Sequence, residues 1–401
     1  MFILERRPPA LPPPGAAAAS PLLVEGSGAP LGSAASPWAP LARWRAFGRV
    51  GRGTAVAVVS LAWASSGLGR VVAAGGGDGS VGLWSRRPAP SIDPADAAGG
   101  WCPVARFEDC GLPCHALAFA PPFNGPGVPG PSGPWTGRAG GRAVAAGFGD
   151  GRIRIYAEGV PRSGTARGSL AEGGERWALA EELSPGRGAG AGPGADPGPD
   201  AVLDLRWRPP GPDEGVGGEE GAATPPPALL VATAPAPPTG RRDLDLSSSG
   251  GDAGPRPQPR GGAAVWWRCP RAAAWRRGLE LSVAPCRAVA WAGGQPRAGA
   301  NAAGGSSSGE LVAVAPLGGC RETGAAALVF RLRGPMDGLV ATPAGGRPLR
   351  AAPGGGGCWR LDWCPYGLDL AASLDSGGTV VWSGGESGSL PTGATSGALG
   401  D

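Results

Sequence analysis

The sequence predicts an all-β fold, a β-propeller of about five recognisable four-stranded blades, and two features of the chain point to it. The first is a repeated hairpin: Gly75–Trp84 reads GGGDGSVGLW and Gly147–Tyr156 reads GFGDGRIRIY. The second is a strand that precedes the hairpin, ends in an aromatic residue and recurs five times. Units repeated in this way are typical of folds in which each unit stacks on its neighbours.

The strand before the hairpin alternates apolar with polar or small residues, as a strand with one buried face does. The aromatic near its end supplies the largest apolar area to that face. The five copies are SLAWA (60–64), HALAFAP (115–121), VLDLRWRP (202–209), RAVAWAG (287–293) and WRLDWCP (359–365), with Trp63, Phe119, Trp207, Trp291 and Trp363 as the aromatics.

Each copy is followed by a second and a third strand joined by a tight turn. Asp78-Gly79 and Asp150-Gly151 supply the positive φ that such a turn needs, and Asp375–Gly378 is a looser version. A more polar fourth strand is predicted at 102–109, 176–183 and 276–283. Four antiparallel strands with an aromatic at a fixed phase describe a propeller blade. Two β-sandwiches with generic hairpins, the alternative, would not share that phase.

Nearly a third of the chain is Gly or Pro, so much of its length is expected to be unstructured. We expect residues 1–36 to be a disordered Pro/Ala/Gly-rich N-terminus, 37–383 to form the propeller, and 384–401 to be a disordered tail. Low-complexity insertions are expected near 123–141, 184–200, 209–227, 234–262 and 294–309, between strands, where added loop length costs little. The strands are rich in Ala where Val or Ile is usual, which predicts a marginal core resting on its aromatics.

Charge and cysteine usage favour an intracellular protein without a metal site. The formal charge of +4 is mild, and the chain has no Lys. The Arg excess accompanies an excess of Ala, Gly and Pro, which favours a solvated surface over a nucleic-acid patch. The eight cysteines form no CxxC pair, and His115 is the single His, so we expect Cys110 and Cys114 to be small buried residues. No secretory segment and no apolar run of about 18 residues is present, so reduced thiols and no membrane span are expected.

The sequence offers no catalytic, cofactor-binding or metal-binding residues, and we expect neither an enzyme nor a cofactor. A phosphate-binding loop needs Lys, and the Gly-rich runs lead into strands where a dinucleotide site needs a helix. Glu181 and Glu182 are adjacent on a strand and point to opposite faces, while Glu219 and Glu220 lie in an expected loop. No charged or aromatic residues are seen to converge on a central pore.

The Asp-Gly turn followed by an aromatic-terminated strand resembles the WD40 repeat, although the Asp that follows the repeat's Trp is absent. Within that class, HALAFAPP followed by an insertion and VAAGFGDGRIRIYAEG resembles the nucleoporin Seh-one and its relative Sec-thirteen. CWRLDWCPYGLDLAASLDSGGTVVW resembles the closing blade of that family. The resemblance covers roughly 38–383. The family has six blades in an open ring and this chain shows five, so either the first blade has been lost or the sequence begins inside it.

The resemblance implies a non-enzymatic scaffold propeller of the nuclear pore complex, in its outer-ring, Y-shaped subcomplex. A partner nucleoporin would insert its own blade by strand addition at an unpaired edge, in an obligate hetero-complex. It implies a place in the nucleus at the nuclear envelope, a role in protein and mRNA transport, and a cytoplasmic or lysosomal-surface pool in nutrient signalling. No direct nucleic-acid contact is expected. A Sec-thirteen-like vesicle-coat subunit and a generic WD40 peptide-recognition adaptor are the alternatives.

Overall fold

The computed structural model divides the chain into two compact units, Met1–Ala57 and Val58–Asp401. The structure describes residues 2–6, 38–43, 57–65, 69–86, 101–108, 110–121, 142–158, 177–184, 200–209, 226–235, 261–269, 274–282, 284–293, 309–318, 325–344, 349–350, 357–364 and 369–383. Among these residues, no helix has the length and apolar character to cross a bilayer.

The first unit contains one antiparallel strand pair, β1 (Phe2–Arg6) with β2 (Trp38–Arg43). Strand β1 lies in the stretch for which disorder is expected. The rest of that stretch, the tail 384–401 and most of each expected insertion lie outside the described residues. Strands extend into the margins of two insertions, since Asp200 begins one strand and Pro235 ends another.

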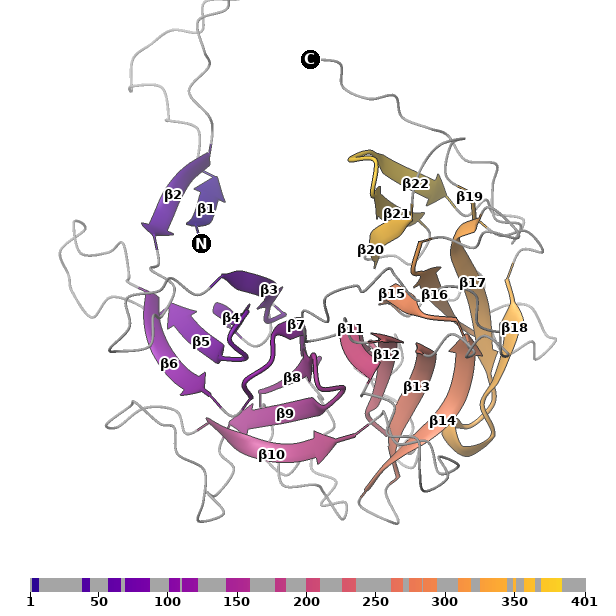
Figure 1. The fold of residues 1–401 in the computed structure, drawn as a ribbon, viewed down its shortest axis with the longest axis horizontal. Helices are drawn as coiled ribbons and strands as arrows, with labels where there is room; N and C mark the ends of the chain where they lie inside the picture. The colour runs from indigo at the N-terminus through magenta and orange to yellow at the C-terminus, as the bar shows by residue number, and fades with distance from the viewer. Residues whose placement is uncertain are drawn as a thin grey trace, which may run out of the picture. The chain divides into compact units, whose positions relative to one another are not determined.

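The second unit contains five sheets whose strands follow one another in chain order, and all pair antiparallel (Figure 1). We call these sheets blades 1 to 5. Blade 1 is β3 (Val58–Trp63), β4 (Val71–Gly76), β5 (Val81–Arg86) and β6 (Trp101–Phe107). Blade 2 is β7 (Cys114–Phe119), β8 (Ala143–Phe148), β9 (Ile153–Glu158) and β10 (Trp177–Leu183). Blade 3 is β11 (Asp200–Trp207), β12 (Ala228–Pro235), β13 (Gly262–Cys269) and β14 (Ala274–Ser282).

Blade 4 is β15 (Cys286–Trp291), β16 (Glu310–Pro316), β17 (Ala325–Arg333) and β18 (Val340–Pro343), and β19 (Leu349–Arg350) also pairs with β17. Blade 5 is β20 (Cys358–Trp363), β21 (Asp369–Leu374) and β22 (Thr379–Ser383). The prediction of five blades is confirmed, and so are the three predicted fourth strands. The fourth strand of blade 4 is not predicted by the sequence, because β18 has only four residues and ends in Pro343, which gives a weak strand signal. The chain is thus a β-propeller with five blades in its described part.

The turns between second and third strands have the predicted chemistry. Gly79, Gly151 and Gly377 have φ of 81°, 76° and 84°, a region that favours glycine. The Asp78 carboxylate accepts hydrogen bonds from the amide and the hydroxyl of Ser80, which closes the first of these turns. Burial would raise the pKa of Asp78, but the bonds from Ser80 outweigh it and lower the pKa.

Two of the joints between successive blades, 2 with 3 and 4 with 5, pack large side chains onto alanines, whereas in the joint between blades 3 and 4 both sides contribute large side chains, among them Trp267 and Trp291. We call the face of a blade that meets the preceding blade its rear face and the opposite face its forward face. Leu205 and Trp207 on the rear face of blade 3 share a core with Ala116, Ala118 and Ala145 of blade 2. Because an indole needs room, the alanines that suggested a marginal core are the surface into which the aromatics fit.

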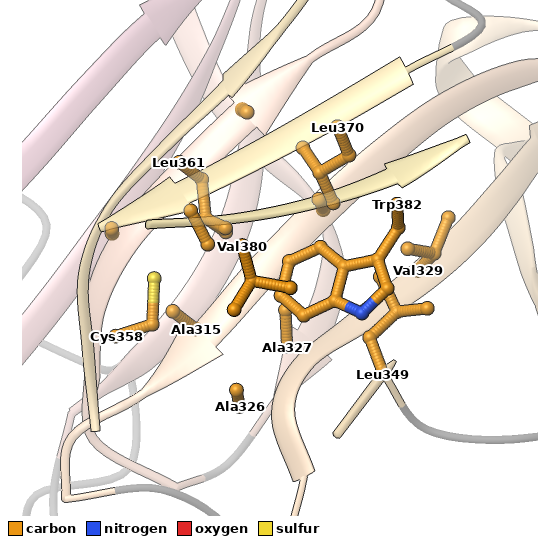
Figure 2. Packing of buried hydrophobic residues seen from close by; sticks show 14 of the residues in the cluster. Ala315, Ala326, Ala327, Val329, Leu349, Cys358, Leu361, Leu370, Val380 and Trp382 are labelled. Carbon is orange, nitrogen blue, oxygen red and sulfur yellow. The ribbon is translucent and has the colours of Figure 1, made fainter. Parts of the chain in front are cut away.

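The contact between blades 4 and 5 follows the same rule. Trp382 of blade 5 lies beside Ala327, Val329 and Leu349 of blade 4 (Figure 2). Trp382 is 2% exposed, and Trp363 on the inner strand of the same face is 8% exposed. The aromatic at the end of each inner strand is therefore a wedge between blades, as the sequence predicts, with one exception described below.

Candidate functional site: an axial cavity and two exposed blade faces

Every inner strand carries a β-bulge at the same point of the repeat. The pairing of each inner strand with its neighbour skips one residue, four positions before the terminal aromatic. A bulge leaves its extra residue unpaired and re-aims that side chain. The five bulge residues are Val59, His115, Leu203, Arg287 and Trp359.

All five bulge residues line one cavity of about 580 Å³. Residues that adjoin the bulges complete the lining, among them Asp204 and Arg360. The expectation that no charged or aromatic side chains converge on a central pore is therefore wrong. The sequence carries only a local sign of it: with the inner strands aligned on their aromatics, the second residue before the aromatic is always Leu or Val, whereas the fourth varies freely. That variation does not show where the five side chains meet.

The charges of the cavity are partly compensated within the protein. Asp204 is half-buried in the cavity wall, and desolvation of its carboxyl group raises the pKa despite the nearby Arg206 and Arg360 guanidinium groups. Arg287 Nη1 lies 2.8 Å from Asp375 Oδ1 in an exposed ion pair. Burial lowers the pKa of His115, so its imidazole is neutral at pH 7. The cavity thus combines cationic, aromatic and aliphatic side chains.

Three cysteines occupy one repeated position, immediately before the bulge residue. Cys114, Cys286 and Cys358 are fully buried, and burial raises the pKa of their thiols to about 12, 11 and 11. The expectation of a small buried residue is confirmed for Cys114, whereas Cys110 is half-buried. Within the described part of the chain, no group of three or more His, Cys, Asp or Glu could hold a metal ion.

The adjacent glutamates of β10 do project to different partners. Glu181 Oε1 lies 2.9 Å from Arg268 Nε of blade 3. Glu182 Oε2 lies 2.8 Å from Arg154 Nε of its own blade. Each carboxylate therefore belongs to a structural ion pair: that of Glu181 joins two blades, and that of Glu182 lies within one blade. Glu219 and Glu220 lie outside the described residues.

On the rear face of blade 1, the aromatic residue of the inner strand is exposed and is not buried between two blades. Trp63 is 56% exposed, whereas Trp207, Trp291 and Trp363 at the same repeat position are 7–8% exposed. On the same face of β3, Val58 and Leu61 are also exposed. The sequence predicts burial for all five aromatics; the physical reason for the difference is that, among the described residues of the second unit, no blade precedes blade 1. An apolar surface of this kind is typical of a binding site for another protein.

The forward face of blade 5 is exposed as well, but it is polar. Arg360, Asp362, Thr379 and Val381 are exposed on it. Within the described residues, β22 is hydrogen-bonded along one edge only, to β21. A strand edge with unpaired main-chain groups is a template for another strand. The two ends of the blade series thus offer an apolar face on blade 1 and a polar face with a free edge on blade 5.

These features define the class of the protein, a β-propeller that offers surfaces for protein interaction. No family model and no curated protein matches the chain. Among solved structures, that of the Dos1 propeller resembles it at 11% sequence identity with a TM-score of 0.43. The match covers 88% of this chain and 61% of that chain, so this chain spans less than two thirds of that propeller's length.

Proposed function

We propose that the protein is a non-enzymatic scaffold propeller of the nuclear pore complex, in its outer-ring, Y-shaped subcomplex, which binds a partner nucleoporin by blade insertion. It supports nucleocytoplasmic transport from the nuclear envelope, and it has a second role in nutrient signalling. The observation that carries the proposal is the exposed rear face of blade 1. Its side chains repeat those which form the joints between blades elsewhere, so the face is complementary to another blade. The resemblance of 115–183 and 358–383 to Seh-one and Sec-thirteen names the kind of partner.

The rear face of blade 1 offers a simple binding geometry. In the joints between blades 2 and 3 and between blades 4 and 5, a Leu and a Trp of the inner strand meet alanines of the preceding blade. Leu61 and Trp63 stand at those positions. A partner blade with small side chains on its forward face would cover them in the way that blade 2 covers Leu205 and Trp207.

The test is affinity capture of the full chain from its own cells followed by mass spectrometry. We expect nucleoporins in stoichiometric amounts with the wild type, their loss with Leu61→Arg, and their retention with Val340→Arg. Val340, 57% exposed on β18, is the matched control because it is also an exposed apolar strand residue. Capture of coat proteins would select the vesicle-coat alternative, and equal capture by both variants would refute binding at this face.

A second candidate function, a peptide-recognition adaptor, is favoured by the axial cavity. Arg287 and Trp359 could receive an acidic and an apolar side chain of a bound peptide. This function predicts that Arg287→Glu abolishes capture of a ligase subunit or peptide ligand while Leu61→Arg does not. The scaffold function predicts the reverse.

A further inference from the structure

The joint between blades 3 and 4 contains a polar clamp on the main chain of the next inner strand. Asp204 Oδ2 accepts a hydrogen bond from the amide of Val289 at 3.1 Å. Arg206 Nε donates to the carbonyl of the same residue at 3.3 Å. Two side chains of opposite charge, one residue apart on β11, therefore hold both main-chain groups of a single residue on β15. The clamp recognises backbone, so it is indifferent to the side chain that it holds.

Blade 5 carries the same two residue types at the same two positions of its inner strand. Counted back from the terminal aromatic, Arg360 stands where blade 3 has Asp204, and Asp362 stands where blade 3 has Arg206. Both lie on the forward face, and both are exposed. Within the described residues, neither makes an ion pair within 4 Å. The carboxylate and the guanidinium group have exchanged positions relative to blade 3. A strand bound to blade 5 would therefore present its carbonyl where β15 presents an amide, and its amide where β15 presents a carbonyl.

The rest of this face suits a strand with small or polar side chains. Ser373 lies opposite Arg360 in the sheet and Ala371 lies opposite Asp362. On β22, Thr379 and Val381 continue the two rows. A tryptophan wedge of the kind found in the other joints has no alanine-rich surface to enter here.

We propose that the forward face of blade 5 binds an extended strand of a partner protein by its main chain, with Asp362 accepting from an amide and Arg360 donating to a carbonyl. The strand carries Ser, Thr or Ala toward blade 5. This inference rests on the proposed function in that the same inserted blade also covers Leu61 and Trp63. It adds the chemistry of the partner blade. The face toward blade 1 carries small residues, and the strand toward blade 5 carries small or polar residues and is bound through its main chain.

The experiment is site-specific photo-crosslinking in the complex purified with the full chain. The probe is p-benzoylphenylalanine in place of Val381, and the same probe in place of Val340 is the positional control. The crosslinked peptide is identified by mass spectrometry. The yield is then measured in the Arg360→Ala/Asp362→Ala double variant and in Arg277→Ala/Glu280→Ala, which removes an exposed ion pair on β14. Thermal unfolding of both variants checks that they remain folded.

We expect a crosslink from position 381, and none from position 340, to a Ser-, Thr- or Ala-rich strand of a second polypeptide. The yield should fall roughly tenfold in the Arg360/Asp362 variant, since hydrogen bonds to charged groups are the strong ones, and it should be unchanged in the control. A crosslink within this chain or to a second copy of it, no crosslink, or equal yields in the two variants would overturn the inference. A clamp-dependent crosslink to a coat protein would support the inference while refuting the nucleoporin assignment.

Discussion

Replacement of Trp363 by alanine tests whether the repeated aromatics are wedges between blades. Trp363 is 8% exposed and lies in the core shared by blades 4 and 5. A buried aromatic of this size removes about 150–250 Å² from water, which at about 25 cal/mol per Å² corresponds to about 4–6 kcal/mol. Partial relaxation around the truncated site brings the expected loss of unfolding free energy to about 3–5 kcal/mol.

Trp63→Ala is the matched control because it removes the same side chain from the same repeat position. Trp63 is 56% exposed, so it buries a little under half the area that Trp363 buries and its removal leaves no enclosed cavity, and the expected loss is about 2 kcal/mol. Both values are measured by urea unfolding, followed by circular dichroism and by tryptophan fluorescence. Losses that differ by less than about 1 kcal/mol would refute the assignment of Trp363 to a joint and of Trp63 to an open face.

Three further outcomes follow from the interior of the propeller. Trp207→Phe should lower the free energy of unfolding by about 1–2 kcal/mol more than Trp363→Phe, measured by urea unfolding. The reason is that Trp207 Nε1 donates to the carbonyl of Ala118 at 2.9 Å, whereas Trp363 Nε1 is buried without an acceptor among the described residues. Equal losses in the two variants would contradict this. The three buried cysteines at the repeated position should resist iodoacetamide at pH 8 until the protein unfolds, because burial raises the pKa of their thiols, and rapid labelling of the native protein would contradict their placement. Desolvation raises the pKa of the Asp204 carboxyl group, so the folded state binds its proton more tightly than the unfolded chain does. The wild type should therefore lose stability relative to Asp204→Asn as pH rises from 4 to 7, and a constant difference across that range would exclude such a shift.

The strands could be predicted from the sequence because their signals are local. Alternation, Asp-Gly turns and a phased aromatic all lie within one blade, so the burial of Trp207 and Trp363 follows from the local sequence alone. The position of β18 could not be predicted, since a strand of four residues ending in Pro343 carries little local signal.

The features that make the candidate site are non-local, so they cannot be predicted from the sequence of one blade. The sequence around Trp63 has the same pattern as that around Trp363; its exposure depends on which blade precedes it, and a local pattern does not contain that information. The cavity likewise forms only when five bulges, far apart in the chain, meet at one place. The clamp formed by Asp204 and Arg206 on Val289 joins residues more than eighty positions apart.

The most direct test of the account is a cryo-electron microscopy map of the full chain in complex with the protein that it captures. The account predicts an additional antiparallel sheet, contributed by the partner, with small side chains against Leu61 and Trp63 and a strand of its main chain at Arg360 and Asp362. A map in which those two faces are covered by this chain alone, or in which the partner binds elsewhere and leaves both faces to solvent, would contradict it.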